Sequence, residues 1–279
     1  MLSPAQRAHF AQVGYIVLPE FKSMEAIAAL RRRAEEIVNE FDPGEHRTIF
    51  TTREQIKSTD EYFLRSDNAI RCFFEEEAFD EHGVLRQDKS LSINKIGHAL
   101  HDLDPVFEAF SRDPTLDAVA RDLGLRNARL WQSMYIFKQP GIGGEVGWHQ
   151  DATFFDTDPV TVTTFWFALE DATLDNGCLW VEPGGHRSPL RERFVRNGDQ
   201  VSMEKLDNTP WPDASSALAL QAKAGSLVCF HGLLPHYSAP NRSLASRHAY
   251  TLHATDAAAA YSPHNWIQRD IAFPVRGFI

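Results

Sequence analysis

The chain has 279 residues, of which 43% are hydrophobic and 24% are charged, an ordinary composition for a globular protein. Its formal net charge of −10 disfavours polyanionic partners, so neither nucleic acid nor an anionic membrane surface is expected to bind it. No apolar run approaches the roughly 20 residues that a membrane-spanning helix needs.

Helices are predicted at the start of the chain. Ser3 is suited to cap a first helix, Pro4 suits its first turn, Gln6 completes a capping box and Gly14 ends it. A short strand is expected within GYIVLPEF, and a second helix is expected to begin at Ser23. The apolar residues of that helix recur at spacings of three and four: Ile27, Leu30, Ala34, Ile37 and Phe41.

The next part of the chain changes from irregular to helical. Residues 42–92 are polar, and no regular element is predicted there. Two helices are expected to start at the Asp-Pro pairs 104–105 and 113–114. The second of these presents an apolar face and stops at Gly124.

After Gly124 the sequence is typical of a β-sandwich or barrel. Short aromatic and β-branched runs are separated by Gly, Pro and Asn: RLWQSMYIFK, TVTTFWFALE, CLWVEPG, GSLVCFHG and RHAYTLHAT. No linker divides the two parts. A single domain over residues 1–279 is therefore expected, with a helical flank and first strands over about 1–124 and a β core over about 125–279.

The cellular compartment is predicted from the cysteines and the N-terminus. Cys72, Cys178 and Cys229 form an odd, sparse set, which suits reduced thiols. The opening MLSPAQRAHF lacks the basic start and apolar core of a secretory signal. A cytoplasmic location is expected, and the oligomeric state, monomer or dimer, stays open.

The stretch EVGWHQDATFF contains a candidate metal chelate. It places His149 two residues before Asp151, and on a strand these side chains would point to the same face. An imidazole and a carboxylate are suitable ligands for Fe(II), Mn(II) or Zn(II). The pair alone is weak evidence, because the same two residues also fit a solvated turn.

A third ligand is needed, and six histidines follow downstream: His186, His231, His236, His248, His253 and His264. His236 comes after the expected strand SLVCF and a proline turn, where a ligand at a strand end belongs. Arg247 opens the next expected strand, and antiparallel pairing would bring it near His236. Two histidines and one carboxylate leave three positions of an octahedral metal open, as in non-haem Fe(II) oxygenases. An arginine nearby is suited to hold a carboxylate through two hydrogen bonds.

The combined set resembles the phytanoyl-CoA dioxygenase family of Fe(II)- and 2-oxoglutarate-dependent oxygenases. The resemblance runs from about residue 2 to about residue 266. Its most specific stretches are SINKIGHALH, QSMYIFKQP, GGEVGWHQDATFF, EDATLDNGCLWVEPGGH and LPHYSAPNRSLASRHAY. It implies a mainly β fold with flanking helices, built on a double-stranded β-helix or jelly roll with the metal at one mouth.

The resemblance also implies roles for single residues. The iron ligands would be His149, Asp151 and His236. His236 is preferred over its neighbour His231, because its spacing to Arg247 fits the family. Arg247 would pair with the far carboxylate of 2-oxoglutarate, and Ser238 would donate a hydrogen bond to it. Three more side chains would line the cosubstrate: Lys95, Met134 and Trp166. From the residues alone, Trp166 fits a core aromatic better than a cofactor contact.

The activity implied is hydroxylation of an unidentified small molecule, with Fe(II), 2-oxoglutarate and O2 consumed and succinate and CO2 released. Two alternatives stay open: a cupin-like metal enzyme that does not use 2-oxoglutarate, and a jelly-roll binding protein without turnover. The first leaves Arg247 and Lys95 without a task, and the intact triad counts against the second. Substrate choice is expected to lie in two long segments without periodicity, residues 46–67 and 190–215.

Overall fold

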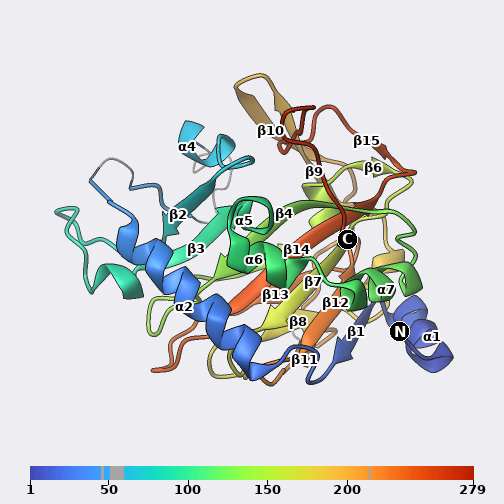
Figure 1. Cartoon of the computed structure of the whole chain (residues 1–279), viewed down its shortest axis with the longest axis horizontal. Coiled ribbons are helices and arrows are strands. Elements are labelled where there is room, and N and C mark those ends of the chain that lie inside the picture. Colours follow the sequence, from blue (N-terminus) through green and yellow to red (C-terminus); the bar gives the residue numbers. More distant parts are fainter. Residues whose placement is uncertain (45–46, 51–59, 214) are drawn as a thin grey trace.

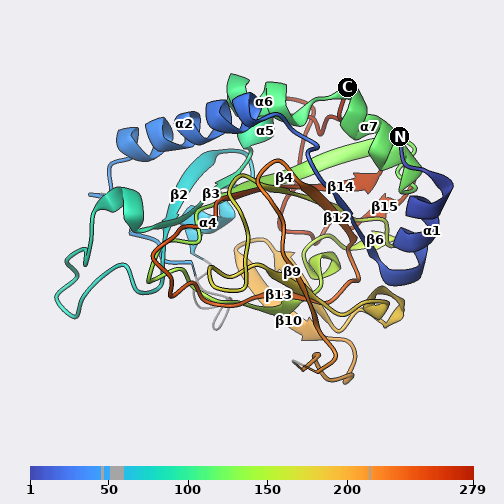
Figure 2. The same cartoon turned by 90° about the horizontal axis from the view of Figure 1, so that it is seen from below.

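The computed structural model describes residues 1–44, 47–50, 60–213 and 215–279, and two facing antiparallel sheets dominate it (Figures 1 and 2). The larger sheet has the strand order β1 (Tyr15–Leu18), β12 (Leu227–His231), β7 (Thr163–Ala168), β14 (Ala249–Asp256), β4 (Ala128–Ile136), β3 (Ile93–His98) and β2 (Ile70–Phe74). The smaller sheet has the order β11 (Leu218–Leu220), β8 (Leu179–Val181), β13 (His236–Ser238) and β5 (Val146–His149). Paired sheets of this kind are the jelly-roll arrangement, which confirms the predicted fold class.

Helices cover the outer face of the larger sheet, as Figure 2 shows. They are α2 (Met24–Glu40), α5 (Leu100–Leu103), α6 (Pro105–Ser111) and α7 (Pro114–Asp122), while α1 (Pro4–Val13) lies beside β1 and α4 (Glu61–Leu64) near β2. The described residues also form 3₁₀ turns at Lys89–Leu91, Asp151–Thr153 and Gly185–Arg187. Two ribbons complete the fold: β9 (Glu192–Asn197) with β10 (Gln200–Lys205), and β6 (Thr157–Asp158) with β15 (Ala260–Tyr261).

The predicted helix starts are confirmed by their caps. The Ser3 hydroxyl accepts a hydrogen bond from the amide of Gln6, whose side chain accepts one from the amide of Ser3. Gly14 ends α1 at a φ of 85°, a left-handed conformation that glycine adopts without strain. Ser23 caps α2, whose buried face differs by one position from the prediction, because Val38 is buried where Ile37 was expected.

Alternation along the central strands separates two interiors. On β14, Tyr250 and Leu252 belong to the apolar core beneath the helices, whereas Ala249 belongs to a second core between the sheets. On β7, Phe165 likewise belongs to the core beneath the helices and Trp166 to the core between the sheets. The face that points between the sheets therefore also carries the polar residues of these strands, and the functional site lies on that face.

Two segments predicted to be irregular contain regular structure. Within residues 42–92, the run IRCFF forms β2, which pairs with β3 along the edge of the larger sheet. The apolar run of β2 is short and is followed by acidic residues. The segment as a whole therefore shows no strand-like periodicity, and the strand is not visible from the sequence. Within residues 190–215, β9 and β10 form a hairpin, where a structureless loop was expected. Residues 51–59, part of the other expected specificity segment, lie outside the described residues.

None of the described helices combines the length and the hydropathy needed to span a membrane. The three cysteines are buried and free in the structure. The division of the chain into domains stays a prediction, although strands from both parts of the sequence pair in the larger sheet.

Removal of a buried side chain of α2 tests the packing of the helices on the larger sheet. Leu30 is 0% exposed, so Leu30→Ala leaves a cavity and should lower the free energy of unfolding by about 2–5 kcal/mol in urea denaturation. Leu244, which is 99% exposed, is the matched control, and Leu244→Ala should change that free energy by less than about 0.5 kcal/mol. Equal effects of the two variants would contradict the packing described.

Candidate metal centre and its pocket

Three predicted ligands converge between the sheets: His149, Asp151 and His236. Their ligand atoms all lie within 4.8 Å of one another. His149 ends β5 and His236 begins β13, and the two residues are direct partners in the pairing of these strands. Asp151 does not continue β5, as a strand-based chelate would require, but begins a 3₁₀ turn that directs its carboxylate back to the two imidazoles. The Nε2 atoms of His149 and His236 are each 3.6 Å from its Oδ1.

Hydrogen bonds set the orientation of both imidazoles. The Nδ1 of His149 lies 2.8 Å from the carbonyl oxygen of Gly147, and the Nδ1 of His236 lies 3.0 Å from that of Leu234. A carbonyl oxygen only accepts, so each Nδ1 carries the proton and each Nε2 presents its lone pair to the shared space. Burial lowers the pKa of His236 to about 4, so its ring is neutral at physiological pH. Two neutral imidazoles and one carboxylate are a suitable donor set for a divalent first-row metal.

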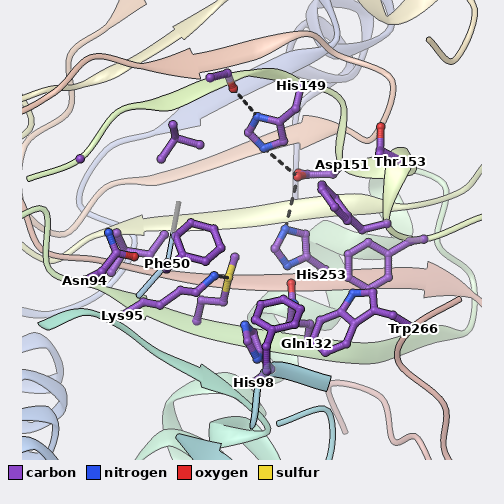
Figure 3. A pocket seen from close by; sticks show the side chains of 18 of the residues that line it. Phe50, Asn94, Lys95, His98, Gln132, His149, Asp151, Thr153, His253 and Trp266 are labelled. Carbon is purple, nitrogen blue, oxygen red and sulfur yellow. Dashed lines mark hydrogen bonds and ion pairs between the residues drawn. The ribbon is translucent and has the colours of Figure 1, made fainter. Parts of the chain in front are cut away.

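The second oxygen of Asp151 has partners of its own (Figure 3). Thr164 on β7 donates a hydrogen bond to Oδ2, and the Nε2 of His253 on β14 lies 3.5 Å from the same atom. Phe155 stacks on the His253 ring, with centroids 5.1 Å apart and planes at 17°. Burial by itself raises the pKa of Asp151, but the neighbouring His236 and His253 hold it well below its usual range. The carboxylate is thus ionised and held in one orientation.

His253 was one of the candidates for the third ligand, and its position explains why it is not part of the triad. It reaches the carboxylate oxygen that points away from His149 and His236. The rival His231 lies elsewhere: its Nδ1 accepts a hydrogen bond from the amide of Leu233, and its ring faces His186 at 5.5 Å. Of the described histidines, His149 and His236 are the two that share a possible metal site with Asp151.

Arg247 lies close to the end of β13 and is 2% exposed. Its Nη2 donates to the hydroxyl of Ser238 at 3.1 Å, and its Nε donates to the carbonyl of Gly177 at 3.1 Å. The third nitrogen, Nη1, is buried and has no hydrogen-bond partner in the described structure. Burial lowers the pKa of Arg247 to about 10, so the guanidinium stays charged at neutral pH. The face of the Trp166 ring lies 5.5 Å from it.

Gly177 makes this arrangement possible. Its φ is 82°, and a Cβ atom there would lie 2.6 Å from the carbonyl oxygen of Ala239 and 2.8 Å from the side chain of Lys138. The backbone therefore approaches so closely that no side chain fits, and its carbonyl accepts hydrogen bonds from both Arg247 and Ser238.

A pocket of about 540 Å³ opens beside the triad and includes His149 and Asp151 in its wall. Of the other predicted side chains, Lys95 and Met134 line it, whereas Trp166, Ser238 and Arg247 are not among the residues that line it. The Lys95 ammonium lies 3.2 Å from the centroid of the Phe50 ring and 3.9 Å from the sulfur of Met134. Burial holds the pKa of Lys95 well below its ordinary value.

Sequence reasoning missed four polar side chains of this region: Thr164, His253, Gln132 and His98. The sequence offers His253 only as a candidate ligand, and it offers His98, which ends β3, only as part of the stretch SINKIGHALH. Thr164, His253 and Gln132 are partners in neighbouring strands, since Thr164 pairs with His253 and His253 with Gln132. That alignment depends on strand pairing, which no local motif reveals.

Comparison with known proteins agrees with the metal site that the geometry indicates. The family model described as phytanoyl-CoA dioxygenase (PhyH) matches residues 10–249. A phytanoyl-CoA dioxygenase of Arabidopsis thaliana is 45% identical over 96% of this chain and 94% of its own length. Phytanoyl-CoA dioxygenase domain-containing protein 1 of Bos taurus is 43% identical over 98% of each chain. The resemblance seen in the sequence is thereby confirmed.

Solved structures share the fold at lower identity. The non-haem α-ketoglutarate-dependent carbocyclase SnoK from nogalamycin biosynthesis superposes with a TM-score of 0.67 at 18% identity, over 99% of this chain and 96% of its own. EctD from S. alaskensis, crystallised with 2-oxoglutarate and 5-hydroxyectoine, gives 0.64 at 22% identity, over 94% of this chain and 78% of its own. Both similarities support the jelly-roll fold.

The hydrogen bond from Thr164 to Asp151 should contribute to metal affinity. Thr164→Val keeps the side-chain shape but removes the donor, so we expect the dissociation constant for Mn(II) to rise about 10- to 100-fold in calorimetric titration. Thr163, the preceding residue, donates to the carbonyl of Thr161 instead, and Thr163→Val should leave the metal affinity within about threefold of wild type. Indistinguishable affinities of the two variants would contradict this role.

Proposed function

The chain belongs to the phytanoyl-CoA dioxygenase family, and on this premise we propose which residues carry the reaction: His149, Asp151 and His236 hold the iron, while Arg247 and Ser238 hold 2-oxoglutarate. The protein is a non-haem iron dioxygenase that uses 2-oxoglutarate and O2 and hydroxylates a small molecule that is not identified. The observation that carries the assignment is the convergence of two imidazole lone pairs and an oriented carboxylate at the wall of a pocket.

When iron is bound, it supplies one kind of chemistry, the activation of O2 coupled to oxidation of 2-oxoglutarate to succinate and CO2. The protein supplies the rest. His149, Asp151 and His236 would hold the metal, and the pocket lined by His149 and Asp151 would admit the reactants to it. Each Nδ1 keeps its proton and donates it in a hydrogen bond to a backbone carbonyl oxygen, which holds the imidazole in one orientation.

Arg247 has the features of a carboxylate anchor. It is a buried cation that makes no ion pair with any described residue, and its Nη1 has a hydrogen bond left to donate. A guanidinium binds a carboxylate more strongly in a water-poor interior than at the surface. Ser238 and Gly177 fix the remaining nitrogens, so the side chain is oriented before the anion arrives. We assign Arg247 to the C5 carboxylate of 2-oxoglutarate. Ser238 is assigned to the same carboxylate, to which its hydroxyl would donate on turning away from the Gly177 carbonyl.

Lys95, Met134 and Trp166 are proposed to support the same cosubstrate in different ways. Lys95 is a desolvated amine in the pocket wall, and a nearby dianion would restore its protonated form. Met134 contacts Lys95 and contributes an adaptable apolar surface. Trp166 is a core residue that acts through Arg247, because its ring face lies beside the guanidinium.

Aromatic side chains are suited to exclude water from the reacting centre. Trp148 lines the pocket and stacks on Tyr237 of the neighbouring strand β13, with centroids 5.4 Å apart. Phe154 and Phe155 line the pocket from the 3₁₀ turn that carries Asp151. A site enclosed in this way protects reactive species from hydrolysis and from loss of protons.

We further propose that the protein forms a single domain, residues 1–279, that acts in the cytoplasm. The net charge of −10 and three buried free cysteines support this location, and neither nucleic acid nor a membrane is expected as a partner. Purified protein given Fe(II) and 2-oxoglutarate should release succinate, whereas a cupin-like enzyme independent of 2-oxoglutarate or a non-catalytic binding protein should release none.

Loss of the proposed anchor should weaken 2-oxoglutarate specifically. In Arg247→Ala we expect the KM for 2-oxoglutarate to rise by about tenfold or more, measured by succinate release, with little change in metal content. Arg242, which pairs with Glu77 at the surface, is the control, and Arg242→Ala should keep the wild-type KM. An unchanged KM in Arg247→Ala would remove this residue from the cosubstrate site.

The choice between the two neighbouring histidines is tested by metal content. His236→Ala removes one of three ligands, so we expect loss of bound iron and of turnover. His231→Ala removes a ring outside the triad and should retain iron. The iron content of both purified variants is measured, with circular dichroism as a folding control. Loss of iron from His231→Ala and its retention in His236→Ala would refute the ligand assignment.

A further inference from the structure

The pocket wall contains buried polar groups that the proposed chemistry does not use. Gln132 is 6% exposed, and its carboxamide makes no hydrogen bond with any residue that the structure describes. His98 is 0% exposed, and its Nε2 has no partner within the same residues. Buried polar groups are nearly always paired, because an unpaired one loses its hydration without compensation. The buried, unpaired Nε2 of His98 and the carboxamide of Gln132, which lines the same pocket, point to a ligand that completes them.

The hydrogen-bonding role of His98 is fixed by its neighbours. The hydroxyl of Ser66 donates to the carbonyl of Phe63, so its oxygen accepts the proton of His98 Nδ1 at 2.6 Å. The Nε2 atom is therefore a bare acceptor. Burial and the nearby Lys95 hold the pKa of His98 well below its ordinary value, which keeps the ring neutral. A group that binds Nε2 must donate a hydrogen bond, and a carboxylate has none to donate.

Gln132 lies between His98 and the metal centre. It pairs with His253 across β4 and β14, and His253 in turn contacts Asp151. Its neighbour Ser133 pairs with His98 on β3. Figure 3 shows Gln132 below His253 with its oxygen toward the cavity, and His98 beyond it. Adjacent strands are about 4.8 Å apart, so a molecule held here reaches toward the metal while its head group stays at His98.

The surrounding wall is apolar. Phe63 and Trp266 pack against the His98 ring, with centroids 5.3 Å and 5.1 Å away. Phe155 lies on the other side, stacked on His253. Pockets that are mainly aromatic with a few oriented polar groups bind apolar molecules and fix them through those groups.

We propose that His98 and Gln132 bind the head group of the substrate, an uncharged group that both donates and accepts hydrogen bonds, such as a carboxamide or hydroxyl, on an apolar body. This inference rests on the proposed function, because it takes the metal and 2-oxoglutarate to fill the other end of the pocket. The hydrogen-bond donor of the head group meets Nε2 of His98, and the carboxamide of Gln132 supplies a donor and an acceptor. The apolar body packs among Phe63, Phe155 and Trp266.

A matched pair of small probes tests the chemistry of the site. Benzamide and benzoate have the same shape, but only benzamide is neutral and carries N–H donors. Their binding is measured by ligand-detected NMR on protein loaded with Mn(II) and 2-oxoglutarate. We expect benzamide to bind at least about tenfold more tightly than benzoate, the scale of discrimination given by one or two buried hydrogen bonds. Gln132→Leu and His98→Phe should reduce that ratio to below about threefold and leave 2-oxoglutarate affinity unchanged.

Thermal stability distinguishes a binding role from a structural one. Gln132→Leu removes an unpaired polar group, so the Tm should stay constant or rise by about 2–4 °C. Gln139 is the matched control: it is also buried, at 1% exposed, but its amide donates to the carbonyls of Ser90 and Ile93, both at 2.9 Å. Gln139→Leu should therefore lower the Tm.

Three results would overturn the proposal: no binding of benzamide, equal or tighter binding of benzoate, or a fall in the Tm of Gln132→Leu like that of Gln139→Leu. Failure of the wild-type protein to bind Mn(II) and 2-oxoglutarate would instead refute the proposed function, since the two loading steps are measured before any probe is added.

Discussion

The ionised carboxylate of Asp151 is the constraint on which this structure depends. A buried charge is costly unless it is compensated, and here both oxygens are compensated from different directions. One oxygen faces His149 and His236 from the smaller sheet, and the other is held by Thr164 and His253 from the larger sheet. The carboxylate thus connects the two sheets, and the packing that positions them also determines the geometry of the metal site.

The same principle explains why the cation and the anion of the site are kept apart. Arg247 is as deeply buried as Asp151, yet hydroxyl and carbonyl oxygens satisfy it rather than a carboxylate. An ion pair within the protein would neutralise the charge that a dianionic cosubstrate needs. If Arg247 anchors that cosubstrate, as proposed, binding supplies the counter-charge to a guanidinium that was already desolvated when the protein folded.

Much of the site was predictable, because part of it is local in sequence. His149 and Asp151 are two residues apart on the chain, and His236 and Arg247 flank a single turn, so their spacing together with the family resemblance singled them out. The helix starts at Ser3 and Ser23 were likewise visible from their caps. In contrast, the roles of Thr164 and Gln132 come from the register of β7, β14 and β4, which is set by long-range pairing. The β9–β10 hairpin was missed because both strands are largely polar, so they carry no clear alternation.

The pairing of His149 with His236 has a consequence for the lifetime of the protein. These residues lie far apart in the chain, so a metal bound between them crosslinks two distant segments and selects the folded state over the unfolded one. By mass action, free metal at one hundred times its dissociation constant contributes about 2.7 kcal/mol to the free energy of unfolding, a large share of the stability of a typical domain. A chain that holds metal would therefore open less often than one without it and would be less exposed to proteolysis.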